Sequence, residues 1–381
     1  MESIVIEDVQ LVCHVGNTAA EVLQRLQSGD LPSMNCELVG GREVPVARVN
    51  IPLPPPALPP FATRTNALVQ YCLQRLDCAP LQGVKPERVG VVMGSSNAGM
   101  EEFHEATRCG TPTDEDWQRL EPGSVAHFVA QRLGVRGPAY TISTACSSAG
   151  KALAAAARML EAGVCDAVVA GGGDALCRFA LEGFHALQLI APKRCEPFML
   201  NGGGINHGEG AALFMLTRRT ARHGDIILSG YGETADAHHT TTPEPSGTQA
   251  AHAMRQALHM AGLHAADVDY INMHGTGTDA NDIMELNALT ATFGADCPPC
   301  SSTKPFTGHC LGAAGAVEAA ICVALLQADT ARLPQVAPSV SPSGYEHINF
   351  SSTARRAVRC CLSNSFAFGG NNVSLLLTRH D

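Results

Sequence analysis

The sequence predicts an α/β protein in which one α/β unit occurs twice. Short apolar runs of strand length alternate with segments rich in helix-forming residues, a rhythm typical of a largely parallel sheet with helices on its faces. Two of the helical segments, one after Cys146 and one after His309, consist mainly of Ala and Gly. We expect these two helices to approach closely at the centre of the fold. The halves are predicted to span residues 1–224 and 225–381.

The first half alternates strands and helices along the chain. The prolines of PLPPPALPP, residues 52–60, exclude a helix interior or a central strand and predict a surface loop. The expected elements are strands Ser3–Ile6 and Val9–Val12, helices Thr18–Gln27 and Thr65–Leu76, strands Val89–Gly94 and Tyr140–Thr144, helix Ser147–Leu160, and a strand in CDAVVAGGG.

The second half repeats this order. A helix over Gln249–Ala261 leads into a strand over Asp269–His274, and CSSTKPFTGHCLGAAGAVEAAICVALL predicts a strand, a polar turn and a small-residue helix. Near the C-terminus, SNSFAFGGNN separates the strand-like runs CCLS and VSLLL. Gly369 and Gly370 let the chain turn back and present backbone N–H groups to a site, although a plain hairpin turn is the alternative.

Composition and charge narrow the class of protein. With 381 residues, 45% of them hydrophobic, the chain can bury a sizeable core. A net charge of −10 argues against a nucleic-acid binder, because phosphate contacts need a basic face. No apolar run approaches the roughly 18 residues that cross a bilayer. The N-terminal MESIVIEDVQ carries acids where a secretory signal carries positive charge. We therefore expect a cytoplasmic protein without a membrane span.

The 15 cysteines do not form the pattern of a disulfide framework, because the chain is long and shows no export signal. Cys360 and Cys361 are adjacent in an apolar run, and we expect them to be buried as small hydrophobic residues. Cys297 and Cys300 form a CxxC in CPPC, which can be interpreted as a redox motif or as half of a metal site. No second CxxC or His pair lies at zinc spacing, so an ordinary proline-rich loop is favoured.

Cys146 is the candidate nucleophile. It lies where a predicted strand ends and a predicted helix begins. The free N–H groups and the positive end of that helix favour a thiolate and are expected to lower the pKa of the cysteine. The small residues Ala145, Ser147, Ser148 and Gly150 leave room for a substrate to reach the sulfur. A buried cysteine at the start of a helix is the alternative interpretation.

Two of the 15 histidines are candidates for the same site. His274 ends a predicted strand and opens HGTGTDAND, and His309 lies in TGHCLGAAG just before the second small-residue helix. Both follow a strand and precede a turn into a helix, which is where α/β sheets place their sites. Neither has a neighbour at ligand spacing, so no metal is predicted.

Four charged residues lie close in sequence to these histidines. Lys304 precedes His309 by five residues, and Glu318 follows it by nine. Asp282 and Glu285 follow the other histidine by eight and eleven residues. Surface ion pairs are one interpretation of all four. The other is that they orient the imidazole rings or tune their pKa values.

Five motifs together resemble one family. TACSS around Cys146, HGTGTDAND from His274, KPFTGHCLGAAG from Lys304 and NSFAFGGNN near the C-terminus are similar to the β-ketoacyl-acyl-carrier-protein synthases of the two-histidine type. DAHHTTTPEPSG from Asp236 resembles the mobile loop that flanks the site in that family. The motifs follow the family's order and spacing over nearly the whole chain.

The resemblance implies a thiolase-like fold, with two duplicated halves in a five-layered α-β-α-β-α arrangement. It also implies a homodimer, or a heterodimer with a chain-length-factor-like subunit. The implied activity is that of a β-ketoacyl synthase with no bound cofactor. Cys146 takes an acyl group from the phosphopantetheine of an acyl carrier protein. A malonyl thioester then loses CO2 while His274 and His309 donate hydrogen bonds to its carbonyl oxygen, and the product is a 3-oxoacyl chain two carbons longer.

The resemblance further implies roles for the residues around this centre. The backbone N–H groups of Cys146 and Phe368 hold the tetrahedral oxyanion, and Phe368 with Gly369 and Gly370 forms the gate between the two steps. The remaining roles are a Lys304–Glu318 pair that holds His309, supporting carboxylates at Asp282 and Glu285, an acyl pocket at Asn97 and Phe366, and the mobile loop at Asp236 and His239.

The same motifs exclude close relatives. Thiolases use a second cysteine in a C-terminal glycine-rich motif, where this chain has NSFAFGGNN, and initiating synthases have asparagine in place of His309. Two alternatives stay open. One is a non-catalytic or partner-dependent subunit of a ketosynthase/chain-length-factor heterodimer, although a silent subunit is expected to lack Cys146. The other is a carrier-dependent decarboxylase or acyltransferase that forms no carbon–carbon bond.

One departure from the family concerns docking of the acidic carrier. Where the family has a basic segment before the GEG turn, this chain reads CEPFMLNGGGINHGEG, with no Lys or Arg. Docking then depends on Arg64, Lys193 or Arg194, or on a partner subunit. This departure favours a specialised synthase of a polyene or polyketide pathway over housekeeping fatty-acid synthesis. Acyl chain length and the choice between homodimer and heterodimer stay open.

Overall fold

The computed structural model describes residues 2–55, 60–199, 203–334 and 342–381. Part of the predicted proline-rich loop, residues 56–59, lies outside the described residues. Within those ranges, no helix has the length and apolar character needed to cross a membrane.

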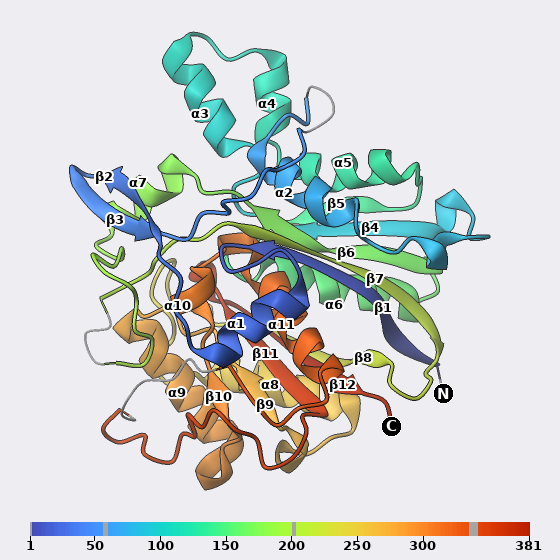
Figure 1. Ribbon diagram of the computed structural model, residues 1–381, viewed down its shortest axis with the longest axis vertical. Coiled ribbons are helices and arrows are strands. Elements are labelled where there is room, and N and C mark those ends of the chain that lie inside the picture. Colours follow the sequence, from blue (N-terminus) through green and yellow to red (C-terminus); the bar gives the residue numbers. More distant parts are fainter. Residues whose placement is uncertain (1, 56–59, 200–202, 335–341) are drawn as a thin grey trace.

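Ten strands form one mixed sheet built from two five-stranded halves (Figure 1). The first half has the order β5-β4-β6-β7-β1, and the second has the order β10-β9-β11-β12-β8. In each half the first two pairings of that order are parallel and the last two are antiparallel. The strands are β1 (Glu2–Cys13), β4 (Val89–Gly94), β5 (Ala139–Ile142), β6 (Ala167–Asp174), β7 (Gly210–Thr220), β8 (Ile226–Ala235), β9 (Tyr270–Asn272), β10 (Cys300–Ser301), β11 (Cys360–Phe366) and β12 (Asn371–Arg379).

The two halves meet at β1 and β8, which pair antiparallel through Val5↔Ile227 and Ile6↔Ile226. Because both halves have the same strand order and directions, the fold uses one α/β unit twice. The division at residues 224 and 225 stays a prediction, and these residues lie between β7 and β8.

Helices complete a five-layered arrangement, which confirms the predicted fold class (Figure 1). One pair covers the outer face of the first half-sheet, one pair lies between the half-sheets, and one pair covers the second half-sheet. In that order the pairs are α2 (Arg64–Leu73) with α5 (Gly123–Leu133), α6 (Ser148–Glu161) with α11 (Ala314–Gln327), and α8 (Thr248–Ala261) with α9 (Asp279–Phe293).

The two central helices approach as closely as their small residues predict. A Cβ added at Gly315 of α11 would lie 2.8 Å from the backbone nitrogen of Gly150 in α6. A Cβ added at Gly150 would lie 2.7 Å from Cγ1 of Val373. Contacts this short leave no room for a side chain without a shift of the neighbour, so Gly315 sets the spacing between the two helices and Gly150 sets the spacing between α6 and β12.

Each central helix is entered through a strained turn of the same kind. Ala145 has φ +54°, and Leu311 has φ +48°. Both residues lie three positions before the first residue of the following helix, Ser148 in α6 and Ala314 in α11. A positive φ is costly for residues with a side chain, and such strain is common at functional sites.

The remaining elements extend this frame. The two strands predicted near the N-terminus are a single strand, β1, with an irregularity between Ile6 and Asp8. Helix α1 matches the expected helix near residue 20. The elements that were not predicted are the hairpin β2–β3, strands β7 and β8, and helices α3, α4, α5, α7, α9 and α10. The remaining bounds are α1 (Ala19–Ser28), β2 (Asn35–Val39), β3 (Arg42–Val46), α3 (Met100–Cys109), α4 (Asp114–Leu120), α7 (Arg178–Ala186) and α10 (Lys304–Thr307). Short 3-10 turns are Ala79–Leu81, Pro86–Arg88, Ala265–Asp267, Gly294–Asp296, Leu311–Ala313 and Phe368–Gly370.

Candidate active site

Cys146 lies directly after the strained residue Ala145 and two positions before α6. Serine hydroxyls brace this turn: Ser147 Oγ donates to the Thr144 carbonyl at 2.8 Å, and Ser148 Oγ donates to the Ala145 carbonyl at 2.6 Å. The cysteine is 7% exposed. The turn therefore holds the sulfur at the start of the central helix, as the sequence predicts.

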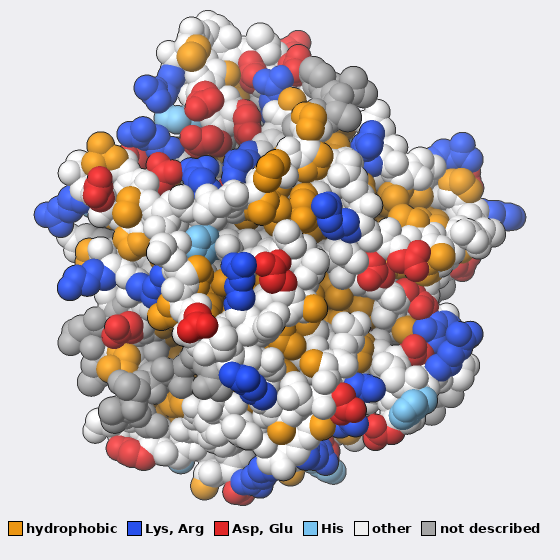
Figure 2. All heavy atoms as spheres, in the orientation of Figure 1, with side chains coloured by type: hydrophobic (Ala, Val, Ile, Leu, Met, Phe, Trp, Pro, Cys, Tyr) orange, Lys and Arg blue, Asp and Glu red, His pale blue; other side chains and the backbone are white. Residues whose placement is uncertain are grey.

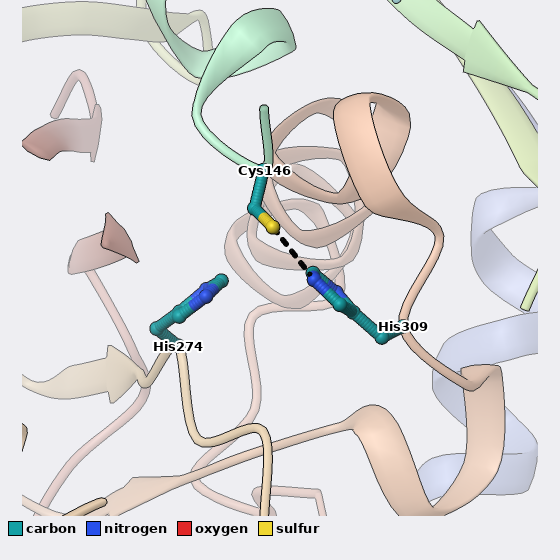
Figure 3. A group of neighbouring side chains, drawn as sticks. All are labelled: Cys146, His274 and His309. Carbon is teal, nitrogen blue, oxygen red and sulfur yellow. Dashed lines mark hydrogen bonds between the residues drawn. The ribbon is translucent and has the colours of Figure 1, made fainter. Parts of the chain in front are cut away.

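The fold brings both predicted histidines to this sulfur (Figure 3). Nε2 of His309 lies 2.9 Å from Sγ of Cys146, in a hydrogen bond whose proton can reside on either atom. The rings of His274 and His309 have centroids 5.4 Å apart and are nearly perpendicular. One ligand-type atom from each of the three residues lies within 4.8 Å of the others. These distances also suit a metal ion. The distance between the histidines along the sequence was therefore not a valid reason to exclude a metal site.

The pKa of Cys146 differs from the sequence-based expectation. Burial raises the pKa of the Cys146 thiol to about 12, although Lys304 and a hydrogen bond from the Phe368 backbone act to lower it. The prediction of a lowered cysteine pKa was therefore wrong, because desolvation outweighs the helix end. Burial and the nearby Lys304 hold the pKa values of His274 and His309 well below the usual value of 6.5. The resting site contains a thiol and two neutral imidazoles.

Lys304 and Glu318 form a buried ion pair behind the histidines. The Lys304 Nζ lies 2.5 Å from Oε1 of Glu318, and both side chains are at most 2% exposed. The ammonium also donates to the backbone carbonyl of His274. The predicted pair is present, but its direct contact is with the His274 segment and not with His309. The reason is that α10 directs Lys304 toward the end of β9.

Asp282 and Glu285 are buried in α9 and form no surface ion pairs. Glu285 accepts hydrogen bonds from the backbone N–H groups of His274 and Gly275, both at 2.8 Å. Asp282 accepts from the N–H of Phe198 at 2.6 Å and from that of Gly277 at 3.2 Å. Burial raises the pKa of each carboxyl to about 7. They position the backbone of the HGTG loop through these bonds to its N–H groups.

Phe368 lines a cavity of about 490 Å³ next to the cluster. Its ring stacks on Phe184 of α7, with centroids 5.4 Å apart and planes 16° apart. Its backbone bonds to the Cys146 sulfur. Gly369 and Gly370 both have positive φ, at 79° and 72°, which the predicted turn requires.

The segment DAHHTTTPEPSG is bonded to this turn. Asp236 donates its N–H to the Gly370 carbonyl at 2.8 Å and accepts from Asn372 Nδ2 at 2.6 Å. The Gly369 N–H donates to the Thr240 carbonyl at 2.7 Å. His239 is exposed, and its Nδ1 accepts from the N–H groups of the residues that follow it. The mobility implied for this segment stays a prediction.

Of the two predicted acyl-pocket residues, Phe366 lies near His274 and Asn97 lies at the buried carboxylate of Asp174. The ring centroid of Phe366 lies 6.3 Å from that of His274. Asn97 donates its N–H to the buried carboxylate of Asp174 at 2.9 Å and its amide to the Ala175 carbonyl at 3.2 Å. The acyl-pocket role of both residues stays a prediction.

His207 is a third buried histidine that the sequence did not single out. It pairs in parallel register with His309, so the two side chains lie on one face. Its ring meets Phe184 edge-on at 4.6 Å, and burial lowers its pKa to about 4. It therefore connects His309 with the Phe184–Phe368 stack. No motif marks it, because the contact depends on two distant segments.

Two buried carboxylates were also missed, and one of them pairs with a predicted docking residue. Asp174 accepts hydrogen bonds from the turn at residues 95–97 and from the Gly312 N–H at 2.7 Å. Glu209 pairs with Arg64, with Nη2 and Oε1 2.5 Å apart, while the Arg64 side chain stays 34% exposed. Arg194 is partly buried and donates to the backbone carbonyls of Pro305 and Pro32. A docking role for either arginine stays a prediction. Lys193 is exposed.

Comparisons with known proteins agree with this geometry. The family model for the N-terminal domain of β-ketoacyl synthases matches residues 66–221, and that for the C-terminal domain matches residues 226–336. Nodulation protein E from Rhizobium meliloti is 37% identical over 298 residues, covering 75% of this chain and 73% of that protein.

Two further relatives extend the match. The 3-oxoacyl-[acyl-carrier-protein] synthase 2 of Rhizobium meliloti (strain 1021) is 34% identical over 351 residues, covering 83% of this chain and 82% of that protein. The structure of a ketosynthase in complex with its chain length factor from Xenorhabdus doucetiae matches with a TM-score of 0.90 and 35% identity, covering 100% of this chain and 98% of that one. This chain belongs to the β-ketoacyl synthase family.

Proposed function

We propose that this chain is a catalytic condensing enzyme, in which Cys146 carries the acyl group and both histidines promote decarboxylation of a malonyl thioester. The observation that supports this most directly is the 2.9 Å contact between Sγ of Cys146 and Nε2 of His309. The His274 ring completes the cluster. A nucleophile within reach of a neutral base is the arrangement that covalent acyl transfer requires.

Acylation begins from the protonated thiol. As the sulfur attacks the thioester carbonyl, its proton passes to Nε2 of His309 and then to the departing carrier thiol. The oxyanion is stabilised by the backbone N–H groups of Cys146 and Phe368, and the Phe368 backbone already bonds to the sulfur. The product of this step is an acyl-Cys146 thioester.

Condensation uses both histidines as neutral donors. Their N–H groups hold the carbonyl oxygen of the malonyl thioester, the bond to the carboxylate breaks, and CO2 leaves while an enolate forms. The enolate carbon attacks the acyl-Cys146 carbonyl, the C–S bond breaks, and the Cys146 thiolate that leaves takes up one proton from solvent. The lowered histidine pKa values support this role, because a neutral imidazole still carries one N–H.

We propose an acyl carrier protein as the carrier of both substrates. The name of the 34% identical relative, 3-oxoacyl-[acyl-carrier-protein] synthase 2, places its product on an acyl carrier protein. On the face seen in Figure 2, basic and acidic side chains are interspersed and no broad basic surface appears. Lys193 is exposed and lies four residues beyond Leu189, which lines the cavity next to Phe368. We therefore assign carrier contact to Lys193 or to a partner subunit.

We also propose that the chain acts as a dimer, with a chain-length-factor-like subunit or with a second copy. The 35% identical structure is a complex of a ketosynthase with its chain length factor. Strand β5 lies at the edge of the sheet, and Tyr140 on it is 39% exposed. An edge strand with an exposed aromatic residue is suited to pairing with another chain. Such a pair favours a specialised polyene or polyketide pathway.

The test is a reconstitution read by intact mass. The protein is incubated with malonyl-carrier and a panel of acyl-carriers, with and without candidate partner subunits, and Cys146→Ala is assayed in parallel. A 3-oxoacyl-carrier that appears only when Cys146 is present supports the proposal. Acetyl-carrier alone would indicate decarboxylation without elongation. Failure of Cys146 to become acylated with any partner would indicate a non-catalytic subunit.

A further inference from the structure

The two cysteines of the CPPC motif contact each other in the folded protein. Cys297 follows the turn Gly294–Asp296, and Cys300 opens β10. Each thiol shifts the pKa of the other, lowering that of Cys297 and raising that of Cys300. The backbone of Asn349 bonds to both: its N–H to the sulfur of Cys297, and its carbonyl, at 3.4 Å, to that of Cys300. The motif is therefore a dithiol and not only a proline-rich loop.

A surface cavity of about 480 Å³ opens on one of these thiols. Cys297 lines it and is 6% exposed, whereas Cys300 is fully buried behind it. The cavity wall carries both basic and acidic side chains, namely Arg355, Arg356, Asp267, Asp269 and Asp296, and Arg356 is paired with Asp269 at 2.7 Å. A small molecule entering the cavity meets Cys297 before Cys300, because Cys300 is not part of the lining.

Other cysteines in the described part of the chain lack this combination. All of them are free thiols. Cys322 and Cys361 are also neighbouring thiols, but both are fully buried in the central core. Cys36 and Cys109 are exposed free cysteines. Within the described ranges, the 297–300 pair therefore combines a thiol on a cavity wall with a second thiol three residues away.

We propose that Cys297 and Cys300 form a redox-active dithiol, which small disulfides of the glutathione type oxidise to an intramolecular disulfide. The Cys297 sulfur attacks one sulfur of the disulfide, a mixed disulfide forms, and the first thiolate leaves. Cys300 then attacks the Cys297 sulfur and displaces the second thiolate. Two protons from the protein accompany the two thiols released, so one disulfide is reduced and one is formed.

The local electrostatics support this order of attack. Hydrogen bonds from Cys300 and from the Asn349 backbone lower the pKa of Cys297, whereas burial raises the pKa of Cys300 well above its usual value. The attacking thiol of a CxxC pair is the one with the lower pKa and better access. Both properties belong to Cys297.

The segment that carries Cys300 is hydrogen-bonded to the backbone of the proposed active site. Cys300 pairs with Ile271 in β9, which leads into His274 two residues after its end. Ser302, two residues beyond Cys300, donates its hydroxyl to the Gly275 carbonyl at 2.7 Å. Closing the disulfide moves the start of β10, so we expect oxidation to slow turnover.

The experiment places the native protein in glutathione buffers of increasing oxidised fraction. Thiols are trapped with N-ethylmaleimide and mapped by peptide mass. We expect the peptide with residues 297 and 300 to lose two hydrogens and to regain them in reduced glutathione. Cys300→Ser should accumulate a glutathione adduct on Cys297, because the resolving thiol is absent. Cys297→Ser should leave Cys300 unmodified, because Cys300 is fully buried.

Internal controls come from the chain itself. The exposed Cys36 should form only an adduct, and the buried Cys322–Cys361 pair should stay reduced. A dithiol at 297 and 300 that stays reduced while Cys36 reacts would overturn the proposal. So would a Cys300→Ser protein with no adduct on Cys297. Because mass is the readout, these outcomes do not depend on the condensing activity. The turnover of the Cys297→Ser/Cys300→Ser variant should not respond to oxidised glutathione.

Discussion

Nε2 of His309 lies 2.9 Å from Sγ of Cys146, although 163 positions separate the two residues in the sequence. His274 shares the cluster but lies across from His309, with its ring nearly perpendicular. The two histidines therefore have unequal access to the thiol, and this inequality can be measured.

We expect the histidine variants to separate the two half-reactions. His309→Asn should slow acylation of Cys146 by about 10²-fold or more, because the thiol loses its proton acceptor. His274→Asn should leave acylation within a few-fold and slow malonyl decarboxylation by about 10²-fold. Single-turnover assays with acyl-carrier and with malonyl-carrier measure the two steps. Equal losses in both assays for both variants would contradict this assignment.

We expect variants of the buried Lys304–Glu318 pair to affect stability and activity differently. Lys304→Met leaves the Glu318 carboxylate buried without its partner, so we expect a loss of about 3–5 kcal/mol in the free energy of unfolding. The double variant Lys304→Met/Glu318→Leu should recover most of that stability.

Activity should not recover with it, because the donor to the His274 carbonyl is still missing. Urea unfolding and decarboxylation rates provide the two readouts. Arg136→Met, which removes an exposed pair with Glu87, is the control and should change neither. A double variant with normal activity would show that Lys304 acts on stability alone.

Glu285 predicts a pH dependence of stability. Burial raises the pKa of its carboxyl from 4.5 to about 7 in the folded protein. Between these values the folded state keeps a proton that the unfolded state has lost, so stability falls as pH rises through that window, by up to ~3 kcal/mol. Below pH 4.5 and above pH 7 the contribution of this group is constant.

Glu285→Gln should remove the share of the slope that Glu285 contributes, while Asp282, whose pKa is also raised to about 7, keeps its own share. Comparing unfolding free energies of the two proteins across the window isolates Glu285 from the buried histidines, which act in the opposite direction. Glu182→Gln is the matched control, because the Glu182 side chain is 41% exposed. A slope that is identical in wild type and Glu285→Gln would refute the assignment.

The spacing of the central helices predicts the effect of a single methyl group. Gly315→Ala and Gly150→Ala each place a Cβ within 2.8 Å of an atom of the neighbouring element. We expect each to destabilise the protein by about 1–3 kcal/mol through overpacking. Gly183→Ala in α7 meets no atom within 4 Å and should be neutral or slightly stabilising. Thermal unfolding of the three variants checks this contrast.

The cluster of one thiol and two imidazoles has a spacing that suits a metal ion, and a chelator tests whether the reaction needs one. The proposed reaction needs Sγ of Cys146 and Nε2 of His309 free to exchange a proton. We therefore expect EDTA to leave the condensation rate unchanged. A loss of rate that added Zn²⁺ restores would instead assign the cluster to metal chemistry.

The sequence predicts the elements whose pattern is local. Val89–Gly94 is an uninterrupted apolar run, and the observed strand has the same bounds. Cys146 and His274 lie in small-residue turns after a strand, as predicted, whereas His309 follows the short helix α10. The structure places all three in one cluster.

Features that depend on distant partners could not be predicted. The sequence shows no partner for Arg64, whereas the fold pairs its guanidinium with Glu209, 145 residues away. The pKa of Cys146 depends on burial, which no local pattern displays. His207 and Phe184 become part of the site only because α7 packs beside the Phe368 turn.

The strained turns before the two central helices explain why a duplicated fold has one reacting centre. Cys146 follows Ala145 in the first turn, and Gly312 follows Leu311 in the second. A Cβ at Gly312 would lie 2.6 Å from Oδ2 of Asp174, so a side chain has no room there. The first copy thus supplies both the nucleophile and the carboxylate that closes the equivalent position in the second. The second copy has glycine at the position equivalent to Cys146 and contributes the two histidines. The two units therefore share a backbone arrangement but supply different groups to the site.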